Sequence, residues 1–456
     1  MKTNLNFLGR SLLLSIFLFP SPGAAEAQGL AIPNRSQLPT PLLSKSFSLA
    51  EAMEVGLEIE ARSPGASWER KGSEAAALII SVDGSYNQDL LLWSGDESSR
   101  YRVMLGRLPK GRHTVSVALN PERSAAGAKE AEVKSLNPLP LTWARGVRTD
   151  DEDQIALSHA PVLFARANTI DRFTDIPLMM YYEILHEAGA DMTVRYTVIF
   201  TNEDGGTQTA ALMARWGRAT DIEWVYEFRV RGQKIIEESY QGVEHETKFF
   251  KGSRTGGDHP LLAVASDNNN FSDLACSAVR FAPMPVRANL ERATRESVMD
   301  TDPKTYRVMT EELVRENRIN DTRIDINTIA DPREYLYIEA TSEQEGATLA
   351  FDVKLKGQSK VFASDLGEPR LRIDRSGYFR TAVRLPKGVA PETVESITAR
   401  CDASSKPAAG RRCQHVIVVR ALVLDVNYIP QTLPLDSQPE ASLSGGETRV
   451  YRLISR

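Results

Sequence analysis

The feature of this 456-residue chain that most constrains its fold is a succession of short apolar runs that alternate with polar residues and end at turn sequences. One run, residues 77–82, ends at Asp83-Gly84, and another, residues 113–119, follows a turn at residues 109–111. Alternation of this kind buries one face of a strand and leaves the other face in water. Short strands at regular spacing, with turn signals between them, are typical of a β-sandwich.

The same pattern returns in the last third of the chain, after a central region that carries most of the histidine. Residues 349–353, 381–385 and 416–426 have the apolar, β-branched composition of strands, and Pro386-Lys387-Gly388 supplies a turn. A second sandwich is therefore expected there.

The clearest helix signal lies between the central region and this second sandwich, at residues 301–317. Asp302 and Pro303 supply an N-cap and a first-turn proline. Tyr306 and Leu313 belong to an apolar set that repeats at helical spacing. We interpret this helix as a connector between domains.

Together these patterns predict a mainly β, multi-domain protein in which two β-sandwiches flank a β-rich central domain, with one connecting helix. The predicted segments are a signal peptide (1–27), a linker (28–50), an N-terminal β-sandwich (51–145), a central β-rich domain (150–300), the connecting helix and linker (301–330) and a C-terminal β-sandwich (331–456).

The N-terminal segment is typical of a secretory signal. Lys2 and Arg10 supply positive charge, and Ala25-Glu26-Ala27 offers a cleavage site with small residues. The apolar run at residues 12–19 is shorter than the roughly 20 residues that a membrane-spanning helix needs. No later run is apolar for long enough to span a membrane, so we predict a periplasmic or secreted protein with no transmembrane segment in its mature chain.

Charge and cysteine usage restrict the partners and the compartment. The formal net charge is −5, and acidic and basic residues are interspersed, which argues against nucleic-acid binding through a basic patch. Cys401 and Cys413 flank a loop-like stretch between two apolar runs. Since an exported protein meets an oxidising compartment, we predict a disulfide between them and interpret Cys276 as a small buried apolar residue.

Common catalytic signatures are absent from the sequence. There is no Gly-x-Ser-x-Gly elbow, no phosphate-binding loop and no dinucleotide-binding fingerprint. His186-Glu187 and His245-Glu246 each begin the zinc-protease pattern, but neither has a second histidine four residues after the first. The sequence therefore leaves open whether the protein is an enzyme, and it assigns no catalytic residue.

The strongest candidate site is the run Gly217-Arg218-Ala219-Thr220-Asp221-Ile222-Glu223-Trp224. On a strand, Asp221 and Glu223 would point to the same face, where two carboxylates repel each other. A divalent cation could lie between them, or Arg218 or Arg215 could form an ion pair with them. They could instead share a proton for acid–base chemistry, or lie on an ordinary solvated strand face.

A second polar cluster, residues 266–273, follows a short apolar strand that begins near His259. Its aspartate and asparagine residues favour side-chain-capped turns, and they also offer oxygen ligands. No metal ligand or cofactor is assigned, although a divalent cation is left open. The predicted binding residues are Arg218, Asp221, Glu223, Trp224, His259 and Asp267.

The order of these motifs resembles the vacuolar protein sorting 62 family and, more distantly, the necrosis-inducing cytolysins. The resemblance rests on His159-Ala-Pro-Val-Leu-Phe164, the acidic run at residues 217–224 and His259-Pro-Leu-Leu-Ala-Val-Ala265. It covers roughly residues 157–285 and implies a β-sandwich at the centre of the chain.

In both families a His-x-x-Asp-Trp-Glu core lies on the sandwich, and in the cytolysins it contributes to a divalent-metal site used in membrane damage. Asp221 and Glu223 match the two acids of that core. Arg218 stands where the families have histidine, and Ile222 replaces the tryptophan. A cationic arginine is a poor neighbour for a bound cation, so the departure weakens the metal site that the resemblance implies.

The leading functional prediction is an exported binding protein for a glycan or another cell-envelope component. One alternative is a hydrolase that uses Asp221 and Glu223 with a histidine. Another is a cytolysin-like, membrane-active protein, as the resemblance implies.

Overall fold

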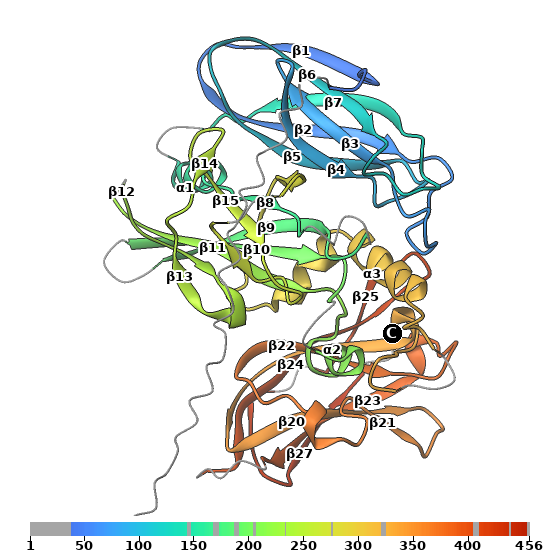
Figure 1. Cartoon of the computed structure of the whole chain (residues 1–456). Coiled ribbons are helices and arrows are strands. Elements are labelled where there is room, and N and C mark those ends of the chain that lie inside the picture. The colour runs from blue at the N-terminus through green and yellow to red at the C-terminus, as the bar shows by residue number, and fades with distance from the viewer. Residues whose placement is uncertain are drawn as a thin grey trace, which may run out of the picture.

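The computed structural model shows a mainly β protein whose sheets follow one another in chain order from one end of the molecule to the other (Figure 1). This confirms the predicted fold class. The structure describes residues 38–143, 147–166, 173–186, 191–203, 207–232, 234–274, 277–320, 325–404, 410–436 and 439–453.

Two facing antiparallel sheets form the N-terminal sandwich, with strand orders β1-β6-β3-β4 and β5-β2-β7. The strands are β1 (Leu43–Leu49), β2 (Met53–Arg62), β3 (Ala77–Val82), β4 (Ser85–Leu91), β5 (Ser99–Leu108), β6 (Gly111–Asn120) and β7 (Glu132–Pro140). Alternate side chains of both sheets meet in one apolar core that includes the fully buried Trp68.

The linker prediction for residues 28–50 is wrong over its last third. Leu43–Leu49 form strand β1, which pairs with β6 along its whole length. Leu43, Phe47 and Leu49 pack against the sandwich core. Their period-2 spacing is a strand signal, but the prolines just before it favoured a linker.

Two further sheets lie in the middle of the chain, with orders β13-β12-β11-β10-β9-β18 and β14-β15-β8-β17. The strands are β8 (Val162–Phe164), β9 (Pro177–His186), β10 (Asp191–Phe200), β11 (Ile222–Arg231), β12 (Lys234–Gln241), β13 (Thr247–Phe249), β14 (Arg254–Thr255), β15 (His259–Val264), β16 (Phe271–Ser272), β17 (Arg280–Phe281) and β18 (Val286–Arg287), with a short 3-10 turn, η1 (Val243–His245), before β13. Their facing side chains share a core rich in tyrosine and phenylalanine.

Two helices of this region have no clear sequence signal. α1 (Arg148–Ser158) is mostly polar and lacks an apolar repeat. α2 (Thr209–Trp216) is short and ends at Gly217, which has a left-handed φ of 61°. A Cβ at this glycine would lie 2.8 Å from the side chain of Arg380. Gly217 thus ends the helix and permits its close contact with β22 (Gly377–Arg384) of the next sheet.

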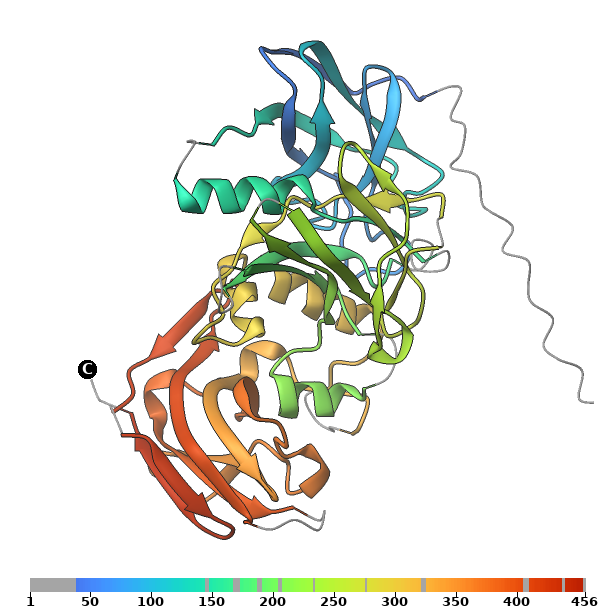
Figure 2. The same cartoon turned by 90° about the vertical axis from the view of Figure 1, so that its left-hand side faces the viewer.

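The connector consists of η2 (Arg295–Thr301) and α3 (Lys304–Arg315). As predicted, Asp302 caps the helix, because its Oδ1 accepts a hydrogen bond from the Lys304 amide at 3.2 Å. Figure 2 shows both elements between the central sheets and the C-terminal sandwich.

Glu312 is fully buried, accepts a hydrogen bond from Trp68 Nε1 at 2.8 Å, and has its pKa raised to about 7 by burial.

The C-terminal sandwich has the sheet orders β22-β19-β24-β25, with β26 also on β24, and β21-β20-β23-β27. The strands other than β22 are β19 (Tyr335–Glu345), β20 (Ala347–Leu355), β21 (Val361–Ala363), β23 (Val394–Ala403), β24 (Arg412–Leu424), β25 (Pro430–Leu433), β26 (Ala441–Ser444) and β27 (Thr448–Arg452), and the short 3-10 turns are η3 (Pro332–Glu334), η4 (Pro369–Leu371) and η5 (Pro391–Thr393).

A disulfide joins Cys401 of β23 to Cys413 of β24, with a Cα–Cα distance of 6.0 Å. The predicted pairing is therefore confirmed, and it links the two sheets of the C-terminal sandwich. Cys276 lies outside the described residues. No helix in the described part of the chain is long and apolar enough to cross a membrane.

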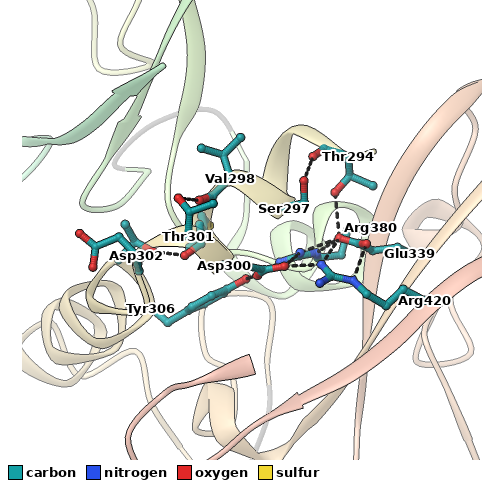
Figure 3. Close-up of polar contacts among 12 residues, drawn as sticks. Thr294, Ser297, Val298, Asp300, Thr301, Asp302, Tyr306, Glu339, Arg380 and Arg420 are labelled. Atoms are coloured by element: carbon teal, nitrogen blue, oxygen red, sulfur yellow. Dashed lines mark hydrogen bonds and ion pairs between the residues drawn. The ribbon is translucent and has the colours of Figure 1, made fainter. Parts of the chain in front are cut away.

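A buried ionic network attaches the connector to the C-terminal sandwich (Figure 3). Arg380 is fully buried and donates to Glu339 at 2.6 Å and to Asp300 at 2.9 Å. Arg420 also donates to Glu339, at 2.8 Å. Tyr306 of α3 accepts a hydrogen bond from Arg380 and donates one to Asp300 at 2.5 Å. Charged groups from three strands and the connector therefore neutralise one another inside this junction.

The bounds of the domains that the sequence predicts stay a prediction.

Candidate functional site

Asp221 and Glu223 lie at the start of β11, and both are buried, with exposed fractions of 1% and 9%. The backbone pairing between β10 and β11 extends to Asp221, whose carbonyl accepts a hydrogen bond from the Phe200 amide at 2.9 Å. Asp221 Oδ2 accepts a hydrogen bond from Asn269 Nδ2 at 2.9 Å. Asp221, Glu223, Asn269 and His245 are called the acidic cluster below.

Glu223 faces the turn that ends at His245. Gln241 of β12 donates a hydrogen bond to Glu223, and His245 Nδ1 lies 3.7 Å from Glu223 Oε2. The other ring nitrogen of His245 contacts the Asn268 amide at 2.8 Å. The two carboxylates therefore both reach the loop at residues 266–270, Asp221 directly and Glu223 through His245.

The two loops of the acidic cluster hold three residues in the left-handed region. Glu244 and His245 have φ values of 62° and 60°, and Asn269 has a φ of 47°. Non-glycine residues in this region cost about 1–3 kcal/mol each and persist where the surroundings hold them. Asn269 is fully buried, and its Nδ2 also donates to Asp175 at 3.0 Å. These contacts hold the loop against β11.

The two acids of the cluster have opposite pKa shifts. Burial, followed by the charges of Glu223 and Glu203, raises the pKa of Asp221 well above its usual value. Burial also opposes ionisation of Glu223, but the His245 ring and the Arg295 guanidinium hold its pKa below the usual value. The Glu223 carboxylate in turn raises the pKa of His245. The surroundings therefore disfavour the charge of Asp221 and favour that of Glu223.

Arg218 does not bridge the two acids. It is 2% exposed, donates a hydrogen bond to the Thr220 carbonyl, and lies with Nε 3.5 Å from Glu296 Oε1 of η2. The turn at Gly217 directs the Arg218 side chain toward the connector. Its charge still acts on Asp221, whose pKa it lowers against the larger effect of burial.

His259 is separate from the acidic cluster, which corrects the predicted site. Its ring is 1% exposed, with Nδ1 2.7 Å from the Ala160 carbonyl and Nε2 3.0 Å from Glu54 Oε2 of β2. Because both nitrogens are engaged, His259 acts as a buried link between the central sheets and the N-terminal sandwich. His259 and Glu54 lie about 200 residues apart along the chain, so no local sequence pattern could predict this contact.

The two remaining predicted residues lie at the edge of the cluster. Asp267 forms an ion pair with Arg166, which also donates to Asp175 at 2.7 Å, so Asp267 is connected to the cluster through that arginine. Trp224 is half-buried, and the Arg195 guanidinium lies 5.7 Å from its ring centroid. Among the described residues, no group of three or more His, Cys, Asp or Glu side chains is arranged to hold a metal ion.

A cleft that no sequence pattern predicted lies between the N-terminal sandwich and the central sheets. This junction cleft has a volume of about 450 Å³ and is bounded by residues 88–91, 100–103, 177–180, 281–284 and 301–302. Clefts of roughly 300–1,000 Å³ at domain interfaces are typical ligand sites. Two other clefts, of about 680 and 420 Å³, are lined by a larger share of charged side chains.

The junction cleft has an apolar interior and a basic side. Leu178, Met179 and Met284 line it and are partly exposed. Arg100 and Arg102 of β5 also line it, and both side chains are exposed. Flexible methionine side chains adapt to ligands of different shape, and arginine forms bidentate hydrogen bonds with carboxylates and phosphates. The cleft therefore fits a ligand with apolar groups and a negative charge.

Comparisons with known proteins identify no family for this chain. No family model and no curated protein matches it. A ruminal GH26 endo-β-1,4-mannanase matches with a TM-score of 0.17 and 12% identity, over 32% of this chain and 27% of its own. The M60 catalytic domain with two CBM51 domains of Clostridium perfringens ZmpB matches with a TM-score of 0.15 and 9% identity, over 81% of this chain and 32% of its own.

These likenesses carry no argument about fold or function, because their TM-scores are far below those of shared folds. This chain also spans only 27% and 32% of the lengths of the two matched structures. The resemblance to the vacuolar protein sorting 62 and cytolysin families stays a prediction, because none of the comparisons bears on it.

Proposed function

We propose that this protein is an exported binding protein for a cell-envelope component, and that the ligand occupies the junction cleft. The observation that carries the proposal is the cleft itself, with about 450 Å³ of space, an apolar interior and arginines along one side. Asp221 and Glu223 of the acidic cluster are buried, so their carboxylates are less accessible to a large ligand than the cleft.

Export is supported by the signal-like N-terminus and by the Cys401–Cys413 disulfide, since disulfides persist in oxidising compartments. The mature protein should begin near Gln28. Terminal sequencing of protein recovered from the periplasm or the medium measures this directly, and an intact Met1 there would contradict export.

A glycan is one form that the envelope ligand could take. Sugars commonly stack on open aromatic faces, and the three aromatic rings that line the cleft are Trp93, Tyr101 and Phe281. They are only 6%, 4% and 5% exposed, and Trp93 and Tyr101 pack edge to face with centroids 5.2 Å apart. The cleft thus offers apolar contacts and arginines rather than an open stacking platform, which favours a non-glycan envelope component.

Two matched valine substitutions test the cleft as the binding site. Val286 lines the cleft and is 40% exposed, whereas Val419 of β24 is 47% exposed and lies on the C-terminal sandwich. The parent protein and the V286E and V419E variants are sedimented with envelope preparations separated into peptidoglycan, phospholipid vesicles and envelope protein. We expect one preparation to retain the parent and V419E but not V286E.

If both variants are retained equally, the ligand binds outside the junction cleft. If no preparation retains the parent, the proposed function is contradicted. Circular dichroism of both variants shows whether the fold is kept. The position of Val286 near the cleft mouth makes a folded V286E protein the expected outcome.

A hydrolase is the second candidate, favoured by the opposite pKa shifts of Asp221 and Glu223 beside His245. Paired carboxylates whose pKa values differ in this way can act as acid and base. A panel of chromogenic esters, phosphates and glycosides tests it. Turnover by the parent that is lost in a folded Glu223→Gln variant would support a hydrolase, and absence of turnover across the panel would count against one.

A further inference from the structure

Strand β5 lies at the edge of its sheet, and its free edge faces the junction cleft. The sheet order is β5-β2-β7, so β5 pairs with β2 on one side only. On its other side, the Met104 amide donates to the Ala282 carbonyl at 2.8 Å, and the Met284 amide donates to the Arg102 carbonyl at 3.0 Å. A segment of the central region thus pairs with this edge as a short antiparallel strand.

That pairing stops where the cleft begins. After Met284 the chain turns away, and Val286–Arg287 form β18, which pairs in parallel with β9. The backbone groups of a strand alternate in direction, so those of Arg100 point to the same side as those of Arg102. Within the described residues, no backbone or side-chain group pairs with the Arg100 N–H or C=O.

The surroundings of this free edge suit an extended peptide. Exposed strand edges are templates for pairing with another chain, and the segment at residues 282–284 already shows the geometry that this edge accepts. The apolar interior of the cleft lies beside the edge and can receive every second side chain of an added strand. The exposed guanidinium of Arg100 favours an acidic residue in the same peptide, whereas the Arg102 guanidinium already pairs with Glu58 at 2.8 Å.

We propose that the junction cleft binds an extended, acidic peptide segment of an envelope protein by strand addition to the edge of β5 at Arg100. This inference rests on the proposed function and names the class of its ligand. Backbone hydrogen bonds supply part of the affinity, and apolar side chains in the cleft supply selectivity. A lipid or a glycan would use the cleft without needing the backbone groups of β5.

The first test uses end-capped hexapeptides that alternate apolar and polar residues and carry one aspartate, measured by fluorescence anisotropy against the full-length mature protein. We expect the best peptide to bind with a Kd on the order of 100 μM or lower. N-methylation of the amides that face β5 should weaken binding about tenfold or more, since hydrogen bonds are lost. N-methylation of the alternate amides, which face away, is the matched control.

The second test uses two substitutions at one position. Arg100→Pro removes the outward N–H, and proline is tolerated at strand edges because it leaves the pairing with β2 intact. Arg100→Ala removes the charge and keeps the N–H. We expect R100A to weaken binding of the acidic peptide roughly threefold, as for the loss of a partly exposed ion pair. We expect R100P to weaken binding of the same peptide by about tenfold or more.

Amide hydrogen exchange supplies a direct readout, because the peptide should slow exchange at Arg100 and leave the distant β24 amides unchanged. If R100P does not fold, the N-methylated peptides and the exchange data on the parent protein still decide the question. Equal effects of the two methylation patterns, or unchanged exchange at Arg100, would overturn strand addition. If no hexapeptide binds while V286E still abolishes envelope retention, the cleft stands as a ligand site and the peptide assignment fails.

Discussion

Replacing Arg380 by methionine should destabilise the C-terminal sandwich by about 3 kcal/mol, since breaking a buried ion pair costs roughly 3–5 kcal/mol. Arg380 is fully buried and donates to Glu339 and Asp300 (Figure 3). Without it, both carboxylates stay in the junction with one guanidinium fewer. Arg420 still reaches both of them, so the cost should lie at the lower end of the range.

The matched control is Arg412→Met in the same sandwich. Arg412 pairs with Glu345 at 2.8 Å, but the two side chains are 53% and 47% exposed, and such surface pairs contribute about 0–1 kcal/mol. Urea unfolding followed by circular dichroism compares the variants, and hydrogen exchange of the β22 amides locates the change. If R380M unfolds at the same urea concentration as R412M, the network contributes little to stability, and the reasoning from burial is refuted.

Three further outcomes are expected from substitutions elsewhere. A Cys401→Ala/Cys413→Ala double variant should lose about 3 kcal/mol of stability in urea unfolding, and non-reducing peptide mapping should find this linkage in the parent. Burial raises the pKa of Glu312 from 4.5 to about 7, so the folded state keeps a proton that the unfolded chain loses, and stability falls as pH rises through this window. Glu312→Gln should therefore be more stable than the parent at pH 8 by roughly 2–3 kcal/mol and equal to it at pH 4, and parallel urea curves at both pH values check this. Burial disfavours the charge of Asp221, whereas the His245 ring and the Arg295 guanidinium favour that of the buried Glu223. Asp221→Asn should therefore cost less stability in urea unfolding than Glu223→Gln, for which we expect about 1 kcal/mol; a larger loss in D221N than in E223Q would contradict these opposite pKa shifts.

The β-sandwich units were predictable because their signal is local. Segments such as residues 77–82 and 381–385 cluster apolar and β-branched residues between turn sequences, and that pattern is typical of a strand whatever sheet it joins. The connecting helix was predictable for the same reason, since Asp302 and the apolar repeat lie within one segment. α2 escaped prediction because eight residues are too few to show a clear helical period.

The acidic cluster was predictable only in part. Asp221 and Glu223 stand two residues apart, so their proximity is a local property of the strand. Their partners come from other segments: Asn269 lies in a loop 48 residues away from Asp221 along the chain, and Gln241 lies at the end of β12, 18 residues from Glu223. Arg218, one of the ion-pair partners that the sequence left open, lies near Glu296 instead, because the helix end at Gly217 directs its side chain there. No spacing rule reveals this.

Local chemistry along the chain was thus enough for the β class, the connecting helix and the pairing of Cys401 with Cys413, because each depends on residues close in sequence. The junction cleft, the partner of His259 and the network around Arg380 depend on which sheet edges and faces meet. These contacts join residues 41–205 positions apart, and they follow from how whole sheets pack, which the order of residues in any one segment does not specify.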